Sequence, residues 1–317
     1  MKKYKMENKR IAIIGGGING LFLAWKLAQK GNDVTVFEKK LGIGSKIVCS
    51  GLFSQRILEY IPQSRALIKN RIKSAVLHFP KKTITINFSK DFFVIDHSSL
   101  DKLVADLALK EGARITLDQS INTIPSGFDR VIGCDGVNSS ARKFLGLPDP
   151  CFRLGLQVFS RKESLADFVE TWPTKKGFIW KIPQGDKVEY GIIDDPGSAR
   201  KTLEDFLGKN NIKTDGLEAK LIPQGLIIPV NEKMTLCGDA AGLTKPWSGG
   251  GVVWGLRAAE ILVESYPDFL AYRRKVRRFF LPKIFMSKLT TKIGYFIGFK
   301  LPWLLPGRIK IESDFIF

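Results

Sequence analysis

The sequence has few of the residues that bind metals. Its 317 residues include 4 cysteines and 2 histidines, and no two cysteines form a CxxC pair. A zinc site or another metal site is therefore not expected. Such sparse cysteine also fits a reducing compartment, which favours a cytoplasmic protein.

Long apolar runs are missing as well. No stretch of about 20 apolar residues is free of charge, so we expect no helix that spans a membrane. The Lys-rich N-terminus leads directly into a strand pattern, and a signal peptide is therefore not expected. A composition with 44% hydrophobic residues and 30 glycines is instead typical of a globular α/β protein.

Acidic residues are scarce compared with basic ones. The chain has 31 Asp and Glu against 50 Lys and Arg, which gives a formal net charge of +19. Such an excess favours an anionic partner. A phosphorylated substrate, a nucleic acid and an anionic membrane surface would each satisfy it, and the charge alone does not choose among them.

The N-terminal part of the chain carries the pattern of a dinucleotide-binding βαβ unit. An apolar strand pattern at 11–14 precedes Gly-Gly-Gly-Ile-Asn-Gly at 15–20, and a helical pattern follows. Glycine at these places permits a sharp turn, lets backbone N–H groups approach a pyrophosphate and lets the helix pack on the strand. Glu38, at the end of the second strand, can accept hydrogen bonds from a ribose, although the unit fits NAD as well as FAD. The predicted cofactor-binding residues here are Gly15, Gly17, Ile18, Asn19, Gly20, Glu38 and Lys39.

Two later segments decide between the two cofactors. Residues 130–142, which include Asp135, resemble the Asp-Gly motif of the flavoprotein hydroxylase superfamily, where this stretch lies near the pyrophosphate. Residues 234–242 resemble its Gly-Asp motif, whose aspartate binds a ribityl hydroxyl of FAD, and this implies such a role for Gly238 and Asp239. Three motifs in this order predict FAD as the cofactor.

A glycine-rich segment follows the Gly-Asp motif and leads into a helical pattern. By the same resemblance, the start of this helix faces the pyrimidine side of the isoalloxazine, where it would stabilise negative charge on the reduced flavin. The residues expected to contact the cofactor here are Gly249, Gly250, Gly251 and Val252.

Within this superfamily the chain resembles the geranylgeranyl reductase family over residues 9–265. Residues 46–52 are similar to its cysteine-containing motif beside the flavin, which implies Cys49 as a catalytic residue and Ser50 and Gly51 as cofactor contacts. Cys49 could donate a proton or could form only a wall of the pocket.

Residues 177–183 resemble the same family's Tyr-x-Trp-x-Phe-Pro motif, which lines the lipid pocket. This chain departs from the pattern at three places, with Phe178 for tyrosine, Ile182 for phenylalanine, and His97 where the family usually has arginine. The predicted substrate residues are Phe178, Trp180, Pro246 and Trp247.

The fold is expected to be α/β, with a Rossmann-like FAD-binding domain and an inserted antiparallel β-sheet substrate domain, as in p-hydroxybenzoate hydroxylase. Alternating runs at 74–79 and 83–88 predict a hairpin, and 100–109 read as a helix. The predicted domains are FAD-binding at 1–72, 92–150 and 230–265, substrate-binding at 73–91 and 151–229, and a C-terminal segment at 266–317.

The C-terminal segment is basic and rich in aromatic residues. Residues 269–311 contain eleven Lys and Arg and no acidic residue, with proline and glycine interrupting the apolar pattern. This stretch fits an anionic membrane surface, or it could deliver a lipid phosphate to the pocket. A helical cap with solvated lysines is the plainer alternative. Nucleic-acid binding is not expected, because no recognition motif accompanies the charge.

The resemblance implies an FAD-dependent reductase that saturates C=C bonds of a polyprenyl, geranylgeranyl-type lipid by hydride transfer from reduced flavin. The electron donor would be NAD(P)H or a ferredoxin-like carrier, and the protein would be cytoplasmic or peripheral at the membrane. An FAD-dependent monooxygenase of an aromatic or lipid substrate is the alternative. A non-catalytic, membrane-associated flavoprotein is a further one.

Overall fold

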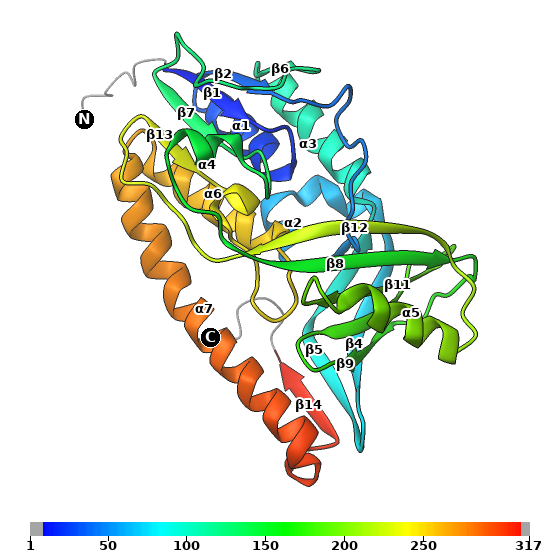
Figure 1. Ribbon diagram of the computed structural model, residues 1–317. Coiled ribbons are helices and arrows are strands. Elements are labelled where there is room, and N and C mark those ends of the chain that lie inside the picture. The colour runs from blue at the N-terminus through cyan, green and yellow to red at the C-terminus, as the bar shows by residue number, and fades with distance from the viewer. Residues whose placement is uncertain (1–8, 312–317) are drawn as a thin grey trace.

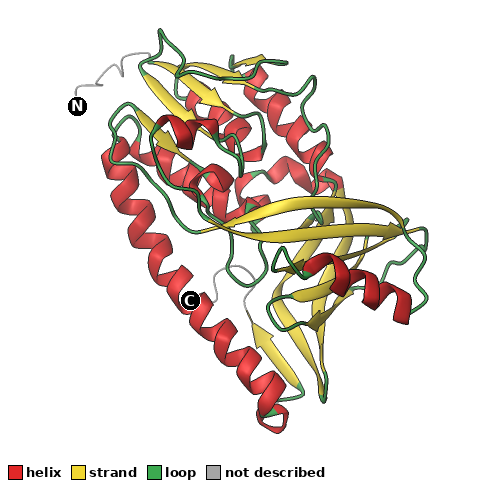
Figure 2. Cartoon of the chain, viewed as in Figure 1, coloured by secondary structure: helices red, strands yellow, loops and turns green. Residues whose placement is uncertain are grey.

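The computed structural model describes residues 9–311 and contains two β-sheets with helices packed around them (Figures 1 and 2). The first sheet has 5 strands in the order β13-β7-β1-β2-β6, and all of its pairs are parallel. These strands come from distant parts of the chain. Their bounds are β1 (Arg10–Ile14), β2 (Asp33–Phe37), β6 (Arg114–Thr116), β7 (Arg130–Gly133) and β13 (Met234–Leu236).

Three helices complete the core of the first sheet. α1 (Ile18–Gln29) packs against α3 (His97–Lys110) and α6 (Val252–Ser265), and apolar side chains of all three are buried with those of the strands. Parallel strands covered in this way are almost wholly apolar, and Ile11, Ala12 and Ile13 of β1 are fully buried. Shorter elements connect these parts: α2 (Ile57–Tyr60), η1 (Pro62–Leu67), α4 (Ser140–Phe144) and η2 (Gly238–Ala241).

The second sheet has 9 strands and is largely antiparallel. Its order is β12-β8-β11-β10-β9-β4-β5-β14, with β3 also paired to β5, and α5 (Ala199–Lys209) covers part of one face. The strands are β3 (Leu52–Ser54), β4 (Ile68–Phe79), β5 (Lys82–Ile95), β8 (Cys151–Ser160), β9 (Phe168–Pro173), β10 (Phe178–Pro183), β11 (Val188–Asp194), β12 (Asp215–Gln224) and β14 (Arg308–Ile311).

The two-sheet architecture confirms the predicted fold class. The predicted hairpin is present as β4 and β5, and the helix expected at 100–109 is α3. β4 and β5 together extend beyond 73–91 at both ends, and β5 also pairs with β3 and leads into α3. The limits of the predicted domains stay a prediction.

The C-terminal segment forms one long helix, α7 (Phe269–Lys300), followed by η3 (Pro302–Leu304) and β14 (Figure 1). The expectation that proline and glycine interrupt this segment is wrong, since α7 continues through Pro282. A proline inside a helix costs about 3 kcal/mol, so contacts at both ends must compensate for it. Within the described residues, no helix combines the length and apolar character needed to cross a membrane.

Those contacts fix α7 to both halves of the molecule. Near its start, Tyr272 and Phe280 are fully buried in the core of the first sheet. Near its end, Gly298 lies so close to Phe79 of β4 that a Cβ there would approach the ring to 2.1 Å. The Phe79 ring also makes an edge contact with Phe299 at 5.6 Å between centroids.

The close approach at Gly298 gives a test of this docking. Gly298→Ala should lower the free energy of unfolding by about 1–3 kcal/mol, because the added methyl group displaces the Phe79 ring. Gly294→Ala is the matched control, since a Cβ at this other α7 glycine would meet nothing within 4 Å. That control should be stabilised by up to about 1 kcal/mol through helix propensity. Urea denaturation measures both, and equal effects of the two substitutions would contradict the docking.

Candidate functional site

The glycine turn after β1 leaves an open cradle at the start of α1. Gly15 has φ +106°, and a Cβ there would lie 2.5 Å from the carbonyl oxygen of Cys134. At Gly17, by contrast, a Cβ would meet nothing within 4 Å, and no side chain caps the helix that begins after it. Uncapped N–H groups and the positive end of the helix dipole therefore face open space. This arrangement fits the pyrophosphate of a dinucleotide.

Two backbone N–H groups hold the Glu38 side chain at the end of β2. Its Oε2 accepts a hydrogen bond from the N–H of Gly16 at 2.6 Å, and its Oε1 accepts one from Lys40 at 3.0 Å. Each carboxylate oxygen can accept a further bond, so the predicted contact with a ribose is compatible with this geometry. Lys39 beside it is exposed.

Asn19 connects the first motif with the third. A Cβ on Gly238 would lie 2.2 Å from its Nδ2, and a Cβ on Gly255 would lie 2.4 Å from its Oδ1. The Asn19 side chain thus occupies space that only glycines leave. Its buried Oδ1 accepts no hydrogen bond from any described residue. An unsatisfied acceptor at this point fits a hydroxyl or N–H of a bound cofactor.

Asp239 lies in η2, and its carboxylate is close to the residue that precedes α6. Its Oδ2 is 3.3 Å from Nζ of Lys220 on β12, and a Cβ on Gly251 would lie 2.8 Å from its Oδ1. No side chain caps α6, which begins at Val252. Gly249, with φ +71°, turns the chain towards this helix. A carboxylate beside a bare helix N-terminus suits both the sugar and the flavin end of FAD.

Asp135 uses its carboxylate to shape the chain after β7. Its Oδ1 accepts from the Ser139 hydroxyl at 2.5 Å, and its Oδ2 accepts from the N–H of Ala141 at 3.0 Å. The backbone of this turn approaches Gly15, where a Cβ would lie 2.8 Å from the Asp135 Cα. Asp135 therefore supports the glycine turn, and its direct contact with the cofactor stays a prediction.

Cys49 lies in a charged cluster that the sequence analysis did not identify. Burial alone would raise the pKa of the Cys49 thiol, but the charge and hydrogen bond of His97 and the charge of Lys220 outweigh it and lower that pKa. The His97 Nε2 is 3.3 Å from Oδ1 of Asp101, one turn further along α3. Burial disfavours the imidazolium, yet Cys49 and Asp101 together raise the pKa of His97 to about 10.

A buried glutamate lies near enough to Cys49 for the charge of Cys49 to affect its pKa. Glu189 on β11 is fully buried, and burial raises its pKa to about 8 against the opposing effect of its hydrogen bonds. Trp180 donates its indole N–H to Oε1 of Glu189 at 2.7 Å, and Gln184 donates to Oε2 at 2.8 Å. Gln184 also donates to the carbonyl of Ser50 at 2.8 Å, which ties this strand pair to the Cys49 segment.

The remaining predicted residues surround these groups. The Phe178 and Trp180 rings on β10 have centroids 6.0 Å apart, and Trp247 makes an edge contact with Trp254 at 6.0 Å. Gly51 has φ +65°, and a Cβ there would lie 2.4 Å from the carbonyl oxygen of Ile95. Pro246 is half-buried. The predicted cofactor and substrate roles stay predictions.

Sequence reasoning missed His97, Asp101, Glu189 and Lys220 as site residues. His97 and Asp101 are four positions apart on one helix, and this spacing indicates that the two side chains are neighbours. Glu189 is an acid near the start of a strand whose next four residues, 190–193, are uncharged, and a fully buried acid is unusual. Nothing in the sequence connects Lys220 with Cys49, because β12 reaches the site only through the order of the second sheet.

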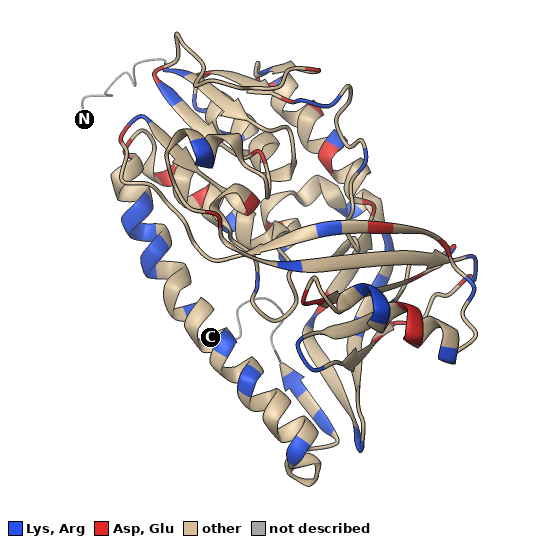
Figure 3. Cartoon of the chain, viewed as in Figure 1, with Lys and Arg blue, Asp and Glu red and all other residues tan. Residues whose placement is uncertain are grey.

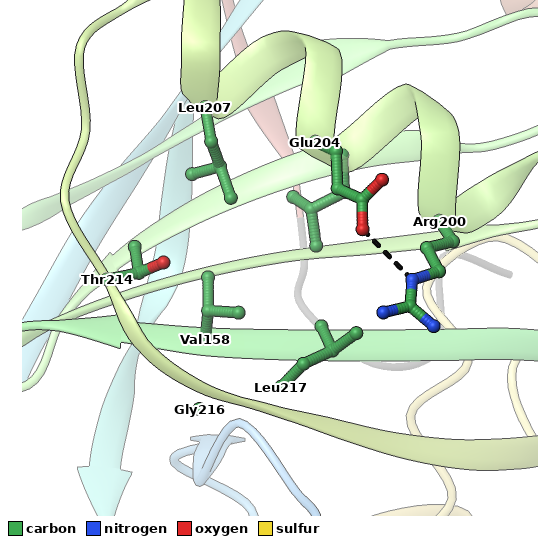
Figure 4. Close-up of a pocket in the computed structure, with 8 residues that line it drawn as sticks. Val158, Arg200, Glu204, Leu207, Thr214, Gly216 and Leu217 are labelled. Atoms are coloured by element: carbon green, nitrogen blue, oxygen red, sulfur yellow. Dashed lines mark hydrogen bonds and ion pairs between the residues drawn. The ribbon is translucent and has the colours of Figure 1, made fainter.

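A separate cavity of about 220 Å³ lies under α5, on the second sheet (Figure 4). Its walls are mostly aliphatic, with Val158 and Leu207 among them. Its charged side chains, Arg200 and Glu204, pair with each other at 2.9 Å. Thr214 adds one hydroxyl to the lining, and none of the predicted site residues lines this cavity.

Comparison with known proteins agrees with this geometry. Residues 10–134 match the family model of FAD-dependent oxidoreductases. A digeranylgeranylglycerophospholipid reductase from Methanococcus vannielii is 26% identical, over 82% of this chain and 78% of the relative. Another such reductase, from Methanothrix thermoacetophila, is 25% identical over 81% of this chain and 77% of its own length.

Solved structures share the fold. A geranylgeranyl bacteriochlorophyll reductase-like protein from Thermoplasma acidophilum has a TM-score of 0.79 at 20% identity, covering 90% of this chain and 87% of its own. The 2-methyl-3-hydroxypyridine-5-carboxylic acid oxygenase has a TM-score of 0.70 at 16% identity, with 93% and 94% covered. The predicted cofactor is confirmed: the chain is an FAD-dependent oxidoreductase with the two-sheet fold of geranylgeranyl reductase-like and hydroxylase-like flavoproteins.

Proposed function

We propose that this protein saturates C=C bonds in a polyprenyl lipid of the geranylgeranyl type. The proposal depends on one observation: an aromatic surface lies close to groups that can hold a proton. Phe178 and Trp180 form this surface, which we call the aromatic wall. The proton-holding groups are Glu189 and the Cys49–His97 pair. The reductases named above, which match most of this chain, support the same substrate class.

The aromatic wall suits a substrate without polar groups at its reacting carbons. An isolated alkene has no carbonyl to polarise, so its reduction depends on position and on exclusion of water. Trp180 is fixed for this purpose, because it donates to Glu189 and lies over Gly191, where a Cβ would approach its ring to 2.2 Å. The indole therefore presents a flat apolar surface at a defined place.

The buried acids can hold the proton that the reaction consumes. Saturation of one C=C bond adds a hydride and a proton, and FAD, once reduced by an electron donor, would supply the hydride when it is bound. With its pKa raised to about 8, Glu189 is mostly protonated at neutral pH. With its pKa raised to about 10, His97 stays an imidazolium at this pH, and its charge lowers the pKa of the Cys49 thiol against the effect of burial. Of these groups, Glu189 is the one already protonated next to the aromatic wall.

The exposed side of α7 supports a peripheral position on a membrane. Five large apolar residues spaced along it are at least 40% exposed, and Lys and Arg occur along the helix with no acidic residue (Figure 3). Each basic residue near an anionic surface contributes about 1 kcal/mol to binding. These apolar residues are Leu281, Phe285, Leu289, Ile293 and Phe296.

The electron donor is proposed on the basis of charge. With 50 basic against 31 acidic residues, the chain attracts an acidic protein carrier such as a ferredoxin by long-range steering. NAD(P)H, bound transiently, is the alternative donor, and reduction of the bound FAD by each in turn separates them.

Anaerobic turnover tests the reductase proposal. Protein reduced with dithionite under argon should convert a digeranylgeranyl lipid to products heavier by one H2 for each bond saturated, read by mass spectrometry. Glu189→Gln, which cannot release a proton at this place, should slow the reaction by about 100-fold while FAD stays bound. A product that forms only with oxygen and gains an oxygen atom would instead establish the monooxygenase. FAD that no donor reduces would favour the non-catalytic flavoprotein.

The charge of His97 should be visible in the reactivity of Cys49. The thiolate is the form that attacks iodoacetamide, and in a background with Cys134→Ser and Cys151→Ser only the half-buried Cys49 and the buried Cys237 remain as thiols. The midpoint of the alkylation rate against pH should lie below 9.0, the ordinary value for cysteine. His97→Asn should move the midpoint to higher pH, whereas His97→Arg, which keeps a positive charge, should restore it. An unchanged midpoint in His97→Asn would remove the pair from the mechanism.

Liposome flotation tests the membrane surface on the full chain. Phe285→Gln with Phe296→Gln should reduce binding to anionic vesicles at least about tenfold, because two exposed aromatic rings no longer enter the bilayer. Leu41→Gln with Leu165→Gln is the control, since these residues are 81% and 75% exposed but lie outside α7. Equal binding by both double variants would refute the membrane role of α7.

A further inference from the structure

A second cavity, of about 380 Å³, lies between α7 and the second sheet. Its walls include Pro246 and Trp247 together with five basic side chains from three parts of the chain. This volume is within the range of small-ligand sites. The basic residues are Arg153 on β8, Lys175 and Lys176 in the turn between β9 and β10, and Lys288 and Lys292 on α7.

Most of this positive charge is not neutralised by the protein. Lys175, Lys288 and Lys292 form no ion pair or hydrogen bond with any residue between 9 and 311. Lys176 pairs with Asp195 at 3.0 Å, which is an exposed contact. Arg153 donates to two backbone carbonyls, those of Lys176 at 2.6 Å and Ile193 at 3.1 Å, so its charge is fixed in place, and the nearby carboxylates of Asp194 and Asp195 offset part of it.

The walls of the cavity are held rigidly. Tyr295 on α7 donates its hydroxyl hydrogen to the carbonyl of Gly177 at 2.7 Å, which ties α7 to the β9–β10 turn. That turn is closed by Thr174, whose Oγ1 accepts from the N–H of Gly177 at 2.8 Å. A Cβ at Gly177 would lie 1.7 Å from the carbonyl oxygen of Ile193, so the turn is packed directly on β11. The cations are thus gathered before any ligand arrives.

The cavity adjoins both segments that are expected to line the substrate pocket. Gly177 directly precedes Phe178 and is three residues before Trp180, and Trp247 is separated only by Ser248 from the glycines that lead into α6. A prenyl chain lying on the aromatic wall would therefore place a polar end beside these basic side chains. Lysine and arginine are the residues that bind phosphate groups, through charge-assisted hydrogen bonds.

We propose that this cavity binds the phosphate-bearing end of the prenyl substrate. The inference rests on the proposed function and extends it: the substrate carries an anionic phosphate ester, and the C-terminal helix supplies part of the site that recognises it. The apolar chain is then positioned from its charged end, and this fixes which C=C bonds reach the aromatic wall.

Calorimetry on the full-length protein tests this proposal with three probes: geranylgeranyl diphosphate, geranylgeraniol and inorganic pyrophosphate. The diphosphate should bind more tightly than the alcohol. Lys288→Gln with Lys292→Gln should lower the affinity for the diphosphate by about tenfold, which corresponds to the loss of roughly one charge-assisted contact. The affinity for the alcohol should stay within about twofold of the wild-type value. Thermal melting confirms that each variant is folded.

The matched control changes charge equally on the same helix. Lys275 and Lys300 are also exposed residues of α7, but they lie outside the cavity. Lys275→Gln with Lys300→Gln should leave all three affinities within about twofold. Equal losses in both double variants would show general attraction by a basic helix and would overturn the site. No preference of the wild type for diphosphate over alcohol would overturn it as well.

The third probe separates a lipid end from a free anion. Inorganic pyrophosphate should bind more weakly than the prenyl diphosphate, because it lacks the chain, and should compete with it. Equal affinity of the two in competition would assign the cavity to a free anion and overturn the lipid proposal, and a lack of competition would overturn it as well. If the prenyl diphosphate binds as expected but anaerobic turnover fails, the site stands and the reductase function falls.

Discussion

The packing of the Asn19 side chain between Gly238 and Gly255 is the contact on which the cofactor end of the molecule depends. These residues lie far apart in the sequence, and each glycine leaves space that a Cβ would fill. Because α1 can approach η2 and α6 so closely, the glycine turn after β1, the Asp239 carboxylate and the bare start of α6 face one another. A larger residue at either glycine would separate the helices, and the positive ends of their dipoles would no longer converge on one ligand.

The electrostatics of the site follow from the same enclosure. Burial raises the pKa of Glu189, so this acid keeps its proton, while the positive charge of His97 lowers the pKa of Cys49 against the effect of burial. The two groups differ in burial and in partner: Glu189 is fully buried and accepts neutral N–H donors, whereas Cys49 is half-buried and lies near positive charge. One site can therefore shift the pKa values of two acids in opposite directions.

The sequence predicted the parts of the site that depend on local chemistry. Gly15, Gly17 and Glu38 belong to one βαβ unit, so their spacing alone indicates a dinucleotide. The alternation in 74–88 likewise predicts the hairpin. What could not be predicted depends on contacts between distant segments, as when β12 brings Lys220 to Cys49, or when Tyr295 on α7 meets the β9–β10 turn. Pro282 shows the same limit, because local propensity ends a helix there and only the packing at Phe280 and Gly298 explains why α7 continues.

The double attachment of α7 has a consequence for how a substrate enters. One end of this helix is part of the core of the first sheet, and the other end is fixed to β4, with β14 pairing to β5 beyond it. A rigid-body hinge motion of one sheet away from the other would have to break one of these attachments. We therefore expect a substrate to enter without domain opening, and this favours ligands that are long, thin and easily bent.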